Sequence, residues 1–474
     1  MRKQEIFHLH PLGWEQDPEE ERFKFSTLDY LPACVYNNYV LFFRLDDGNK
    51  SNMVALLKAG LERTLSQVRH LCGTVEKDAA TGSHSFVKRR DGTIQFHVQW
   101  LDSPQEDLGN NQTYPSFHEL ESHNFSSTVL GDLGLWSVPP MTHGIKPEAH
   151  IDNSPAVSSF KANFIRGGLV FNIHVHHCSN DVMGWAAFTH QLAENCRAIH
   201  EAKTSFSAWD PACLDRSRLL RKDVPEEAKV DGPAPGRPHP DLMPIEQLLF
   251  HLPKSKAARL KALATPSDGT SWISTFDAFS AFIWRTLLRL RMEIFQADPS
   301  TTVLWMAPVD MRKRLHDPPC PPRTQGNVFS LVRSTATAGF VTEGPLSEVA
   351  SFIRRLINGA SQEELDKRLD MVATIRDKTN LFLRADTLAP LTLLVTDWRA
   401  TNIAAADFGL ASPTAFRHVS DNVTRCVVQV YPPRAALPES DEGCEFAIVY
   451  EKSLAKELIE DPEWSEYFEY RGIV

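Results

Sequence analysis

Residues 167–181 read Gly-Gly-Leu-Val-Phe-Asn-Ile-His-Val-His-His-Cys-Ser-Asn-Asp, and this stretch says more about the architecture than any other. Apolar residues alternate from Leu169 to Val175, which predicts a β-strand with one face toward a core. By the same parity His177 lies on the apolar face, whereas His174 and His176 face the other way. A helix from about Trp185 to Glu201 follows the loop, and such strand-loop-helix units are typical of α/β proteins.

His177 and Asp181 form the one His-x-x-x-Asp pattern of the chain, although the chain has 18 histidines. A histidine that leaves the end of a strand on its inward side, where a loop begins, is well placed to meet a substrate. A neutral imidazole suits general-base catalysis because its ordinary pKa lies near neutral pH. A core histidine bonded to a backbone carbonyl is the alternative that this pattern alone leaves open.

The neighbouring histidines do not predict a metal site. Strand alternation divides His174, His176 and His177 between two faces, so the three cannot converge on one ion, and no spaced Cys or His partner follows. Cys178 would point away from His177 if the strand continued, which favours a structural thiol over a nucleophile. We therefore expect no metal ion.

The length of 474 residues suggests two domains, and 42% hydrophobic with 23% charged residues is the balance of a packed globular protein. The clearest break lies between Pro211 and Pro244, because residues 230–240 hold four prolines and two glycines. We predict an N-terminal domain over 1–210, a crossover linker over 211–244 and a C-terminal domain over 245–474. Other predicted elements are a helix over Met53–Val68, a helix capped by Ser274 with Asp277, and strands over Val427–Tyr431 and Glu445–Tyr450.

The net charge of -10 makes nucleic acid an unexpected partner, and any anionic co-substrate must be held by local cations or backbone N–H groups. The N-terminus lacks the apolar region of a secretory signal, and the longest apolar stretches are far too short to span a bilayer. The eight cysteines contain no Cys-x-x-Cys pair and predict free thiols. We expect a cytoplasmic protein with no membrane partner.

Two motifs together carry a resemblance to a known family: His177-Cys-Ser-Asn-Asp181 and, near the end of the chain, Asp407-Phe-Gly409. The chain resembles the BAHD acyltransferases, and most closely their fungal branch that acetylates trichothecenes and related secondary metabolites. Further landmarks in the order of the family are Leu57–Leu65, Gly73-Thr-Val, Gly167-Gly-Leu, Ser274-Thr-Phe-Asp-Ala278, Ile283-Trp-Arg, Val309-Asp-Met-Arg312 and Gly326-Asn327. The chain departs from the family at Leu410-Ala411, where Trp-Gly is usual, and at Val182, where glycine is common.

The resemblance implies an α/β fold of two similar-sized chloramphenicol-acetyltransferase-like domains. Each would be a mixed sheet with flanking helices, with the active-site channel between them. Acyl-CoA, most simply acetyl-CoA, would enter from one face as co-substrate, and an acceptor alcohol would enter from the other. The two would meet at His177 on a monomer without a permanently bound cofactor.

The resemblance also implies roles for other residues. Trp398, in Thr396-Asp-Trp398, would place its indole N–H at the oxyanion of the tetrahedral intermediate, with Thr396 in contact with the substrate. A plain core aromatic is the alternative for Trp398. Asp181 would turn away from the His177 ring toward Arg312 and so fix the catalytic loop. The predicted coenzyme A contacts lie at the capped helix start, Ser274 and Thr275, and at Asp407, Phe408 and Gly409.

Two other functions stay open at this point. A condensation-type acyltransferase that accepts its acyl group from a carrier protein shares the His-His-x-x-x-Asp core. A catalytically silent binding protein is the second, although both motifs are intact in this chain. Thiol release from acetyl-CoA in the presence of hydroxylated acceptors distinguishes these two functions from that of an acyl-CoA-dependent acyltransferase.

Overall fold

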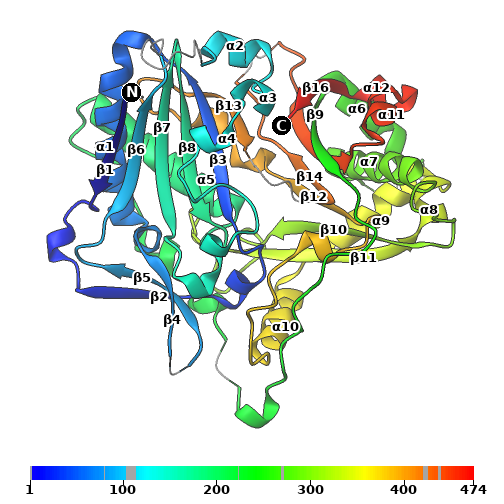
Figure 1. The fold of residues 1–474 in the computed structure, drawn as a ribbon. Coiled ribbons are helices and arrows are strands. Elements are labelled where there is room, and N and C mark those ends of the chain that lie inside the picture. Colours follow the sequence, from blue (N-terminus) through cyan, green and yellow to red (C-terminus); the bar gives the residue numbers. More distant parts are fainter. Residues whose placement is uncertain are drawn as a thin grey trace.

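The computed structural model describes residues 3–79, 81–102, 114–221, 224–267, 272–419, 425–435 and 439–474, and its strands form three sheets (Figure 1). The first sheet has the order β1 (Lys3–Leu9), β6 (Ile94–Trp100), β7 (Ser158–Ile165), β8 (Gly168–His176), β3 (Tyr36–Arg44) and β13 (Pro413–His418). The second has the order β11 (Phe329–Thr337), β10 (Thr302–Asp310), β12 (Leu393–Asp397), β14 (Val427–Val430), β15 (Cys444–Glu451), β9 (Ile245–Leu252) and β16 (Glu469–Ile473). A small third sheet joins β2 (Glu20–Lys24), β5 (His84–Arg89) and β4 (Thr74–Lys77).

The helices cover these sheets. Those of the first half are α1 (Lys50–Gln67), α2 (Phe117–Ser122), α3 (Ser127–Leu130), α4 (Leu133–Trp136) and α5 (Val182–His200). Those of the second half are α6 (Lys254–Ala264), α7 (Thr275–Arg291), α8 (Ala338–Thr342), α9 (Leu346–Asn358), α10 (Gln362–Ala373), α11 (Ala455–Glu460) and α12 (Pro462–Tyr467). In the part of the chain that the structure describes, no helix combines the length and the apolar character that crossing a membrane requires.

Strand β8 lies inside the first sheet, paired antiparallel with both β7 and β3. Its predicted parity is confirmed, because Leu169 and Phe171 join the core that α1 and α5 cover, whereas Val170 packs with α2 to α4 on the opposite face. The predicted helix begins at Val182 rather than Trp185, because the Asp181 carboxylate accepts the Gly184 N–H and so caps α5.

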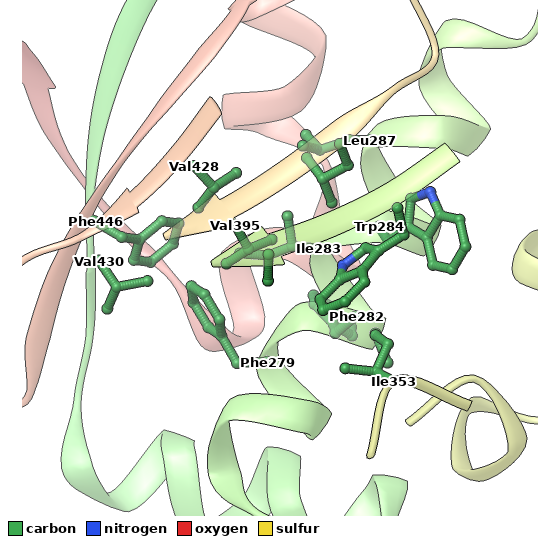
Figure 2. Close-up of a cluster of buried hydrophobic side chains, with 14 of the residues drawn as sticks. Phe279, Phe282, Ile283, Trp284, Leu287, Ile353, Val395, Val428, Val430 and Phe446 are labelled. Atoms are coloured by element: carbon green, nitrogen blue, oxygen red, sulfur yellow. The ribbon is translucent and has the colours of Figure 1, made fainter. Parts of the chain in front are cut away.

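The core of the second half forms between α7 and its sheet (Figure 2). Phe279, Ile283 and Leu287 of α7 pack against the strand residues Val395 and Val428. The predicted capping box is present, since Ser274 caps α7 and pairs with Asp277. This helix therefore begins where its sequence pattern indicates.

The two halves are not cleanly divided along the chain. Residues 413–418, far beyond the linker, form β13 and pair with β3 in the first sheet. The described part of the linker carries only short 3-10 turns, such as Pro211–Leu214 and Glu226–Ala228. The predicted division into 1–210, 211–244 and 245–474 stays a prediction, and β13 crosses it.

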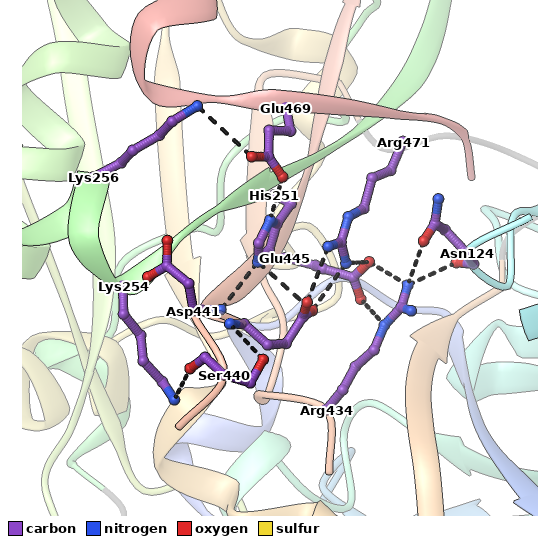
Figure 3. Close-up of polar contacts among 12 residues, drawn as sticks. Asn124, His251, Lys254, Lys256, Arg434, Ser440, Asp441, Glu445, Glu469 and Arg471 are labelled. Atoms are coloured by element: carbon purple, nitrogen blue, oxygen red, sulfur yellow. Dashed lines mark hydrogen bonds and ion pairs between the residues drawn. The ribbon is translucent and has the colours of Figure 1, made fainter. Parts of the chain in front are cut away.

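A buried charge network ties β15 to the first half (Figure 3). Glu445 pairs with Arg417 of β13 at 2.9 Å, with Arg471 at 2.9 Å and with Arg434. Arg434 also donates to the backbone oxygen of Asn124 at 3.2 Å. Although burial alone would raise the pKa of Glu445, the three arginines hold it at about 2, so the carboxylate stays charged between the two sheets.

Candidate active site

His177 stands at the first loop position after β8. Its backbone N–H donates to the Val35 carbonyl at 2.9 Å, which fixes the residue at the end of the β3–β8 ladder. The side chain is partly exposed, and its Nδ1 atom is buried without a hydrogen-bond partner of good geometry among the described residues. That a substrate meets the His177 ring stays a prediction.

The surroundings of His177 favour its neutral form. Burial is the main cause that lowers its pKa below the ordinary value, although nearby backbone groups and the Asp181 charge oppose this. The pKa of His418 in β13 also lies well below its ordinary value. Burial is the main cause, and the charges of His143 and His177 lower the pKa further. The His418 ring meets His143 edge to face, with centroids 4.5 Å apart. An imidazole that stays neutral near pH 7 is able to accept a proton.

Asp181 turns away from the imidazole and pairs with Arg312. Two parallel bonds join Nη2 of Arg312 to Oδ1 at 2.9 Å and Nη1 to Oδ2 at 3.0 Å. The carboxylate also accepts the backbone N–H groups of Gly184 and Val328, each at 2.8 Å. The contact that the resemblance implied is therefore present, and both side chains are buried.

Three supporting residues were missed by the sequence analysis as members of the site. Nδ2 of Asn327 lies 3.0 Å from the His177 carbonyl, 2.9 Å from the Cys178 carbonyl and 3.0 Å from Oδ1 of the fully buried Asp29. Arg216, from the linker, donates to Asp29 at 2.8 Å and to the Ser179 carbonyl at 3.0 Å. Asn327 was noted only as a landmark, and Asp29 stands in a capping-box pattern with Ser26 that could have drawn attention to it.

Trp398 follows β12 directly and lies against the first sheet. Its indole contacts the rings of Tyr39 and His418 edge to face, at centroid separations of 5.9 and 5.7 Å. The indole N–H, which the resemblance placed at the oxyanion, instead donates to the Thr396 hydroxyl oxygen at 2.8 Å. Thr396 is partly exposed and its own O–H is left to donate elsewhere, so the two side chains form one donor unit beside His418.

The comparisons with known proteins bear on this geometry. The model of the Transferase family matches residues 126–463, and that of the trichothecene 3-O-acetyltransferase-like N-terminal domain matches residues 35–196. The chain belongs to the Transferase family, that of the BAHD acyltransferases. The resemblance found in the sequence is confirmed.

Individual relatives agree with this assignment. The chain is 61% identical over 480 residues to acetyltransferase FGR3 of Gibberella zeae, covering 100% of this chain and 95% of that protein. It is 24% identical over 457 residues to trichothecene 3-O-acetyltransferase TRI101 of Fusarium sporotrichioides, covering 92% and 94% of the two chains. The crystal structure of that TRI101 with coenzyme A and T-2 covers 95% of this chain and 100% of its own, with a TM-score of 0.76 at 21% identity. The predicted α/β fold of the family is confirmed.

The second BAHD motif lies away from His177. Phe408 is buried edge-on against Phe43 of β3, with ring centroids 5.2 Å apart. Val35, which accepts the His177 N–H, directly precedes β3, and Phe43 lies eight residues further along the extended chain. The second motif is therefore roughly 25 Å from His177. Gly409 has φ +89, and a Cβ there would stand 2.8 Å from that of His200. These contacts hold the turn before β13 against α5, and binding of coenzyme A at Asp407, Phe408 and Gly409 stays a prediction.

The other predicted coenzyme A contact is the start of α7. The Ser274 hydroxyl both accepts from the Asp277 N–H at 3.3 Å and donates to the Asp277 carboxylate at 2.8 Å. Arg354 pairs with the same carboxylate and lies 4.7 Å from the ring of the exposed Trp272. Ser274 and Thr275 are partly exposed, so one cation, Arg354, and the first N–H groups of α7 lie near this surface.

A separate cavity of about 350 Å³ opens between the β4–β5 hairpin, the linker and residues 373–379. Its walls include Tyr30, Arg221, Arg376 and Asp377. Arg221 pairs with Asp366 and Arg376 with Asp231, so these cations are already matched by carboxylates. Of the described residues that line it, none was predicted to belong to the site.

Proposed function

We propose that this protein transfers an acyl group, with acetyl as the first candidate, from acyl-CoA to a hydroxyl group of a small secondary metabolite. The observation that carries the proposal is the partly exposed His177 at the end of β8, whose imidazole has a lowered pKa and a buried Nδ1 without a hydrogen-bond partner among the described residues. We take Nε2 as the nitrogen that meets the substrate. Membership of the Transferase family and 61% identity to an acetyltransferase support it.

His177 acts as the general base. Nε2 accepts the proton of the acceptor hydroxyl while that oxygen attacks the thioester carbonyl carbon. The tetrahedral intermediate then collapses, and the thiolate of coenzyme A leaves and takes the proton from the imidazolium. General-base catalysis of this kind typically contributes ~10²–10⁴-fold to the rate. No acyl-enzyme is required.

The Thr396–Trp398 pair stabilises the oxyanion of that intermediate. The indole N–H donates to the Thr396 oxygen at 2.8 Å, and the threonine O–H is then available to donate to the oxyanion. A donor aimed at an oxyanion is typically worth ~3–4 kcal/mol of the barrier. Asp181 and Arg312 take no part in proton transfer but fix the loop that carries His177.

The start of α7 is the proposed contact for the anionic part of coenzyme A. Free N–H groups and the helix dipole attract anions there, and Arg354 adds a cation. Arg354 already pairs with the Asp277 carboxylate. It would therefore have to contact both this carboxylate and the anionic part of coenzyme A. We also propose a cytoplasmic protein that acts as a monomer; the free thiols of all eight cysteines support the reducing compartment.

The test is release of free thiol from acetyl-CoA with a panel of hydroxylated terpenoids, polyketides and alkaloids. We expect thiol release that depends on both enzyme and acceptor, with an acetylated product seen by mass spectrometry. A protein that binds coenzyme A but releases no thiol with any acceptor would be a binding protein instead. Activity only with an acyl carrier protein would point to condensation-type chemistry.

A further inference from the structure

A second group of reactive side chains lies next to the loop that carries His177. The Sγ atoms of Cys34 and Cys178 and a ring nitrogen of His176 lie within 4.8 Å of one another. Cys178 is completely buried, whereas Cys34 is partly exposed. Two thiols of unequal exposure therefore stand next to the catalytic loop.

The strand register brings these thiols together. Tyr36 pairs with His176, and the His177 N–H bonds to the Val35 carbonyl. The ladder ends there, and Cys34 and Cys178 stand just beyond it, Cys178 in the turn that the Ser179 N–H closes on the His176 carbonyl at 2.9 Å. The two Sγ atoms lie within 4.8 Å of each other, so a modest local movement is enough to bring them to disulfide distance.

The two thiols differ in acidity. A hydrogen bond from Cys178, aided by His176, lowers the pKa of Cys34 to about 4. Burial raises the pKa of Cys178 well above its usual range. The Cys34 thiol also donates to the Ala149 carbonyl at 3.2 Å. A partly exposed thiol of lowered pKa next to a buried thiol of raised pKa is the arrangement in which the first attacks an oxidant and the second resolves the product.

Cys34, His176 and Cys178 are also a possible set of ligands for a soft metal ion. Cys34 would supply the additional ligand that was missing for the histidines in the sequence. Both ring nitrogens of His176 already have partners, however. Nε2 lies 2.7 Å from the Ala149 carbonyl, and Nδ1 accepts the Cys178 N–H at 3.3 Å. A metal ion would have to displace one of these contacts, so we favour chemistry at the thiols.

We propose that Cys34 and Cys178 form a reversible oxidation site, in which a hydroperoxide joins the two sulfurs in a disulfide and thereby lowers acyl transfer. The Cys34 thiolate attacks the peroxide oxygen, which gives a sulfenic acid and, from hydrogen peroxide, water. The Cys178 thiol then attacks the sulfenic sulfur, and a second water leaves. The two thiols lose two electrons in total, and the peroxide gains them.

The disulfide would act on catalysis through the backbone. Cys178 adjoins His177, and Nδ2 of Asn327 lies within hydrogen-bond distance of the carbonyls of both. Two sulfurs in a disulfide stand about 2.05 Å apart, so their closure pulls residue 178 toward Cys34. A misplacement of about 1 Å at a catalytic group can cost ~10²-fold in rate.

The experiment treats the purified full chain with hydrogen peroxide and maps its peptides without reduction. We expect a Cys34–Cys178 disulfide, a loss of acyl transfer of about tenfold or more, and recovery with dithiothreitol. Cys34→Ser should resist inactivation, and Cys178→Ser should carry a sulfenic acid on Cys34 that dimedone traps. Cys320→Ser, which removes the other partly exposed thiol, is the matched control and should behave like the parent chain.

The activity readout rests on the proposed function, whereas the peptide map does not. Inactivation of Cys34→Ser at the rate of the parent chain, or loss of activity without this disulfide, would overturn the proposal. One equivalent of zinc in the purified protein that disappears in Cys34→Ser would replace it with a metal site. A disulfide that forms without any change in activity would refute the link to catalysis.

Discussion

The ion pair between Asp181 and Arg312 offers a quantitative test of how the catalytic loop is held. Nε of Arg312 donates to the Thr324 carbonyl, and its two Nη atoms donate to Asp181, to Asp310 and to the Gly326 carbonyl. Removing one partner of a buried pair typically costs ~3–5 kcal/mol of unfolding free energy.

The two single variants should fall at different ends of this range. Asp181→Ala leaves Arg312 with Asp310 as a counter-ion at 2.8 Å, so we expect a loss of about 3 kcal/mol. Arg312→Ala leaves the buried Asp181 carboxylate with backbone donors alone, so we expect about 5 kcal/mol. In the double variant neither Asp181 nor Arg312 is left as an unpaired charge, so we expect a loss of about 5 kcal/mol. Additive single losses would give about 8 kcal/mol, and the difference is a coupling of roughly 3 kcal/mol.

Urea unfolding of the parent chain, the two singles and the double measures this coupling, with kcat followed well below each unfolding midpoint. The exposed pair Lys367–Glu364 is the matched control, for which a coupling of about 0–1 kcal/mol is expected. Losses that add within ~0.5 kcal/mol would refute the proposed support role. A stable Asp181→Ala protein whose kcat alone collapses would instead place the carboxylate in the proton transfer.

Other consequences are open to measurement. Trp398→Phe should lower kcat by about tenfold or more with little change in either KM, because the Thr396–Trp398 pair acts on the oxyanion; a change confined to KM would contradict this. Cys178→Ser should keep substantial activity, and intact mass during turnover should show no acylated enzyme; an acyl-cysteine at that position would overturn direct transfer. Burial lowers the pKa of His174 to about 3, so its neutral form stabilises the fold fully above pH 6.5. Unfolding free energy should then fall by about 2 kcal/mol from this group between pH 6.5 and 5, and His174→Asn should remove that part of the acid sensitivity.

Local patterns were sufficient to predict the elements around the site. The alternation in residues 169–175 predicts β8 and its inward face, and the capping box predicts the first turn of α7. The Asp181–Arg312 contact came from the family resemblance rather than from spacing, since 131 positions separate the two residues.

The rest of the site depends on contacts between residues far apart in the sequence, which the local spacing of apolar residues does not reveal. Asn327 reaches Asp29 across 298 positions, and β13 returns to the first sheet only because β3 offers an edge for pairing. Cys34 meets Cys178 just beyond the paired ends of β3 and β8, which requires knowledge of which strands are neighbours. The prediction of no metal site considered the three histidines and only the Cys or His partners that follow them, so it could not include Cys34, which precedes them.

The most direct test of the central claim is the pH profile of kcat for acyl transfer in the parent chain and in His177→Ala. The lowered pKa of His177 keeps the base neutral, so the acid limb of the parent profile should lie below pH 6.5, with activity lost as pH falls through that pKa. His177→Ala should lose at least a hundredfold in kcat and the acid limb, while coenzyme A binding and the unfolding midpoint stay unchanged. His316→Ala, at an exposed histidine, should match the parent chain. Retention of most activity in His177→Ala would contradict the account.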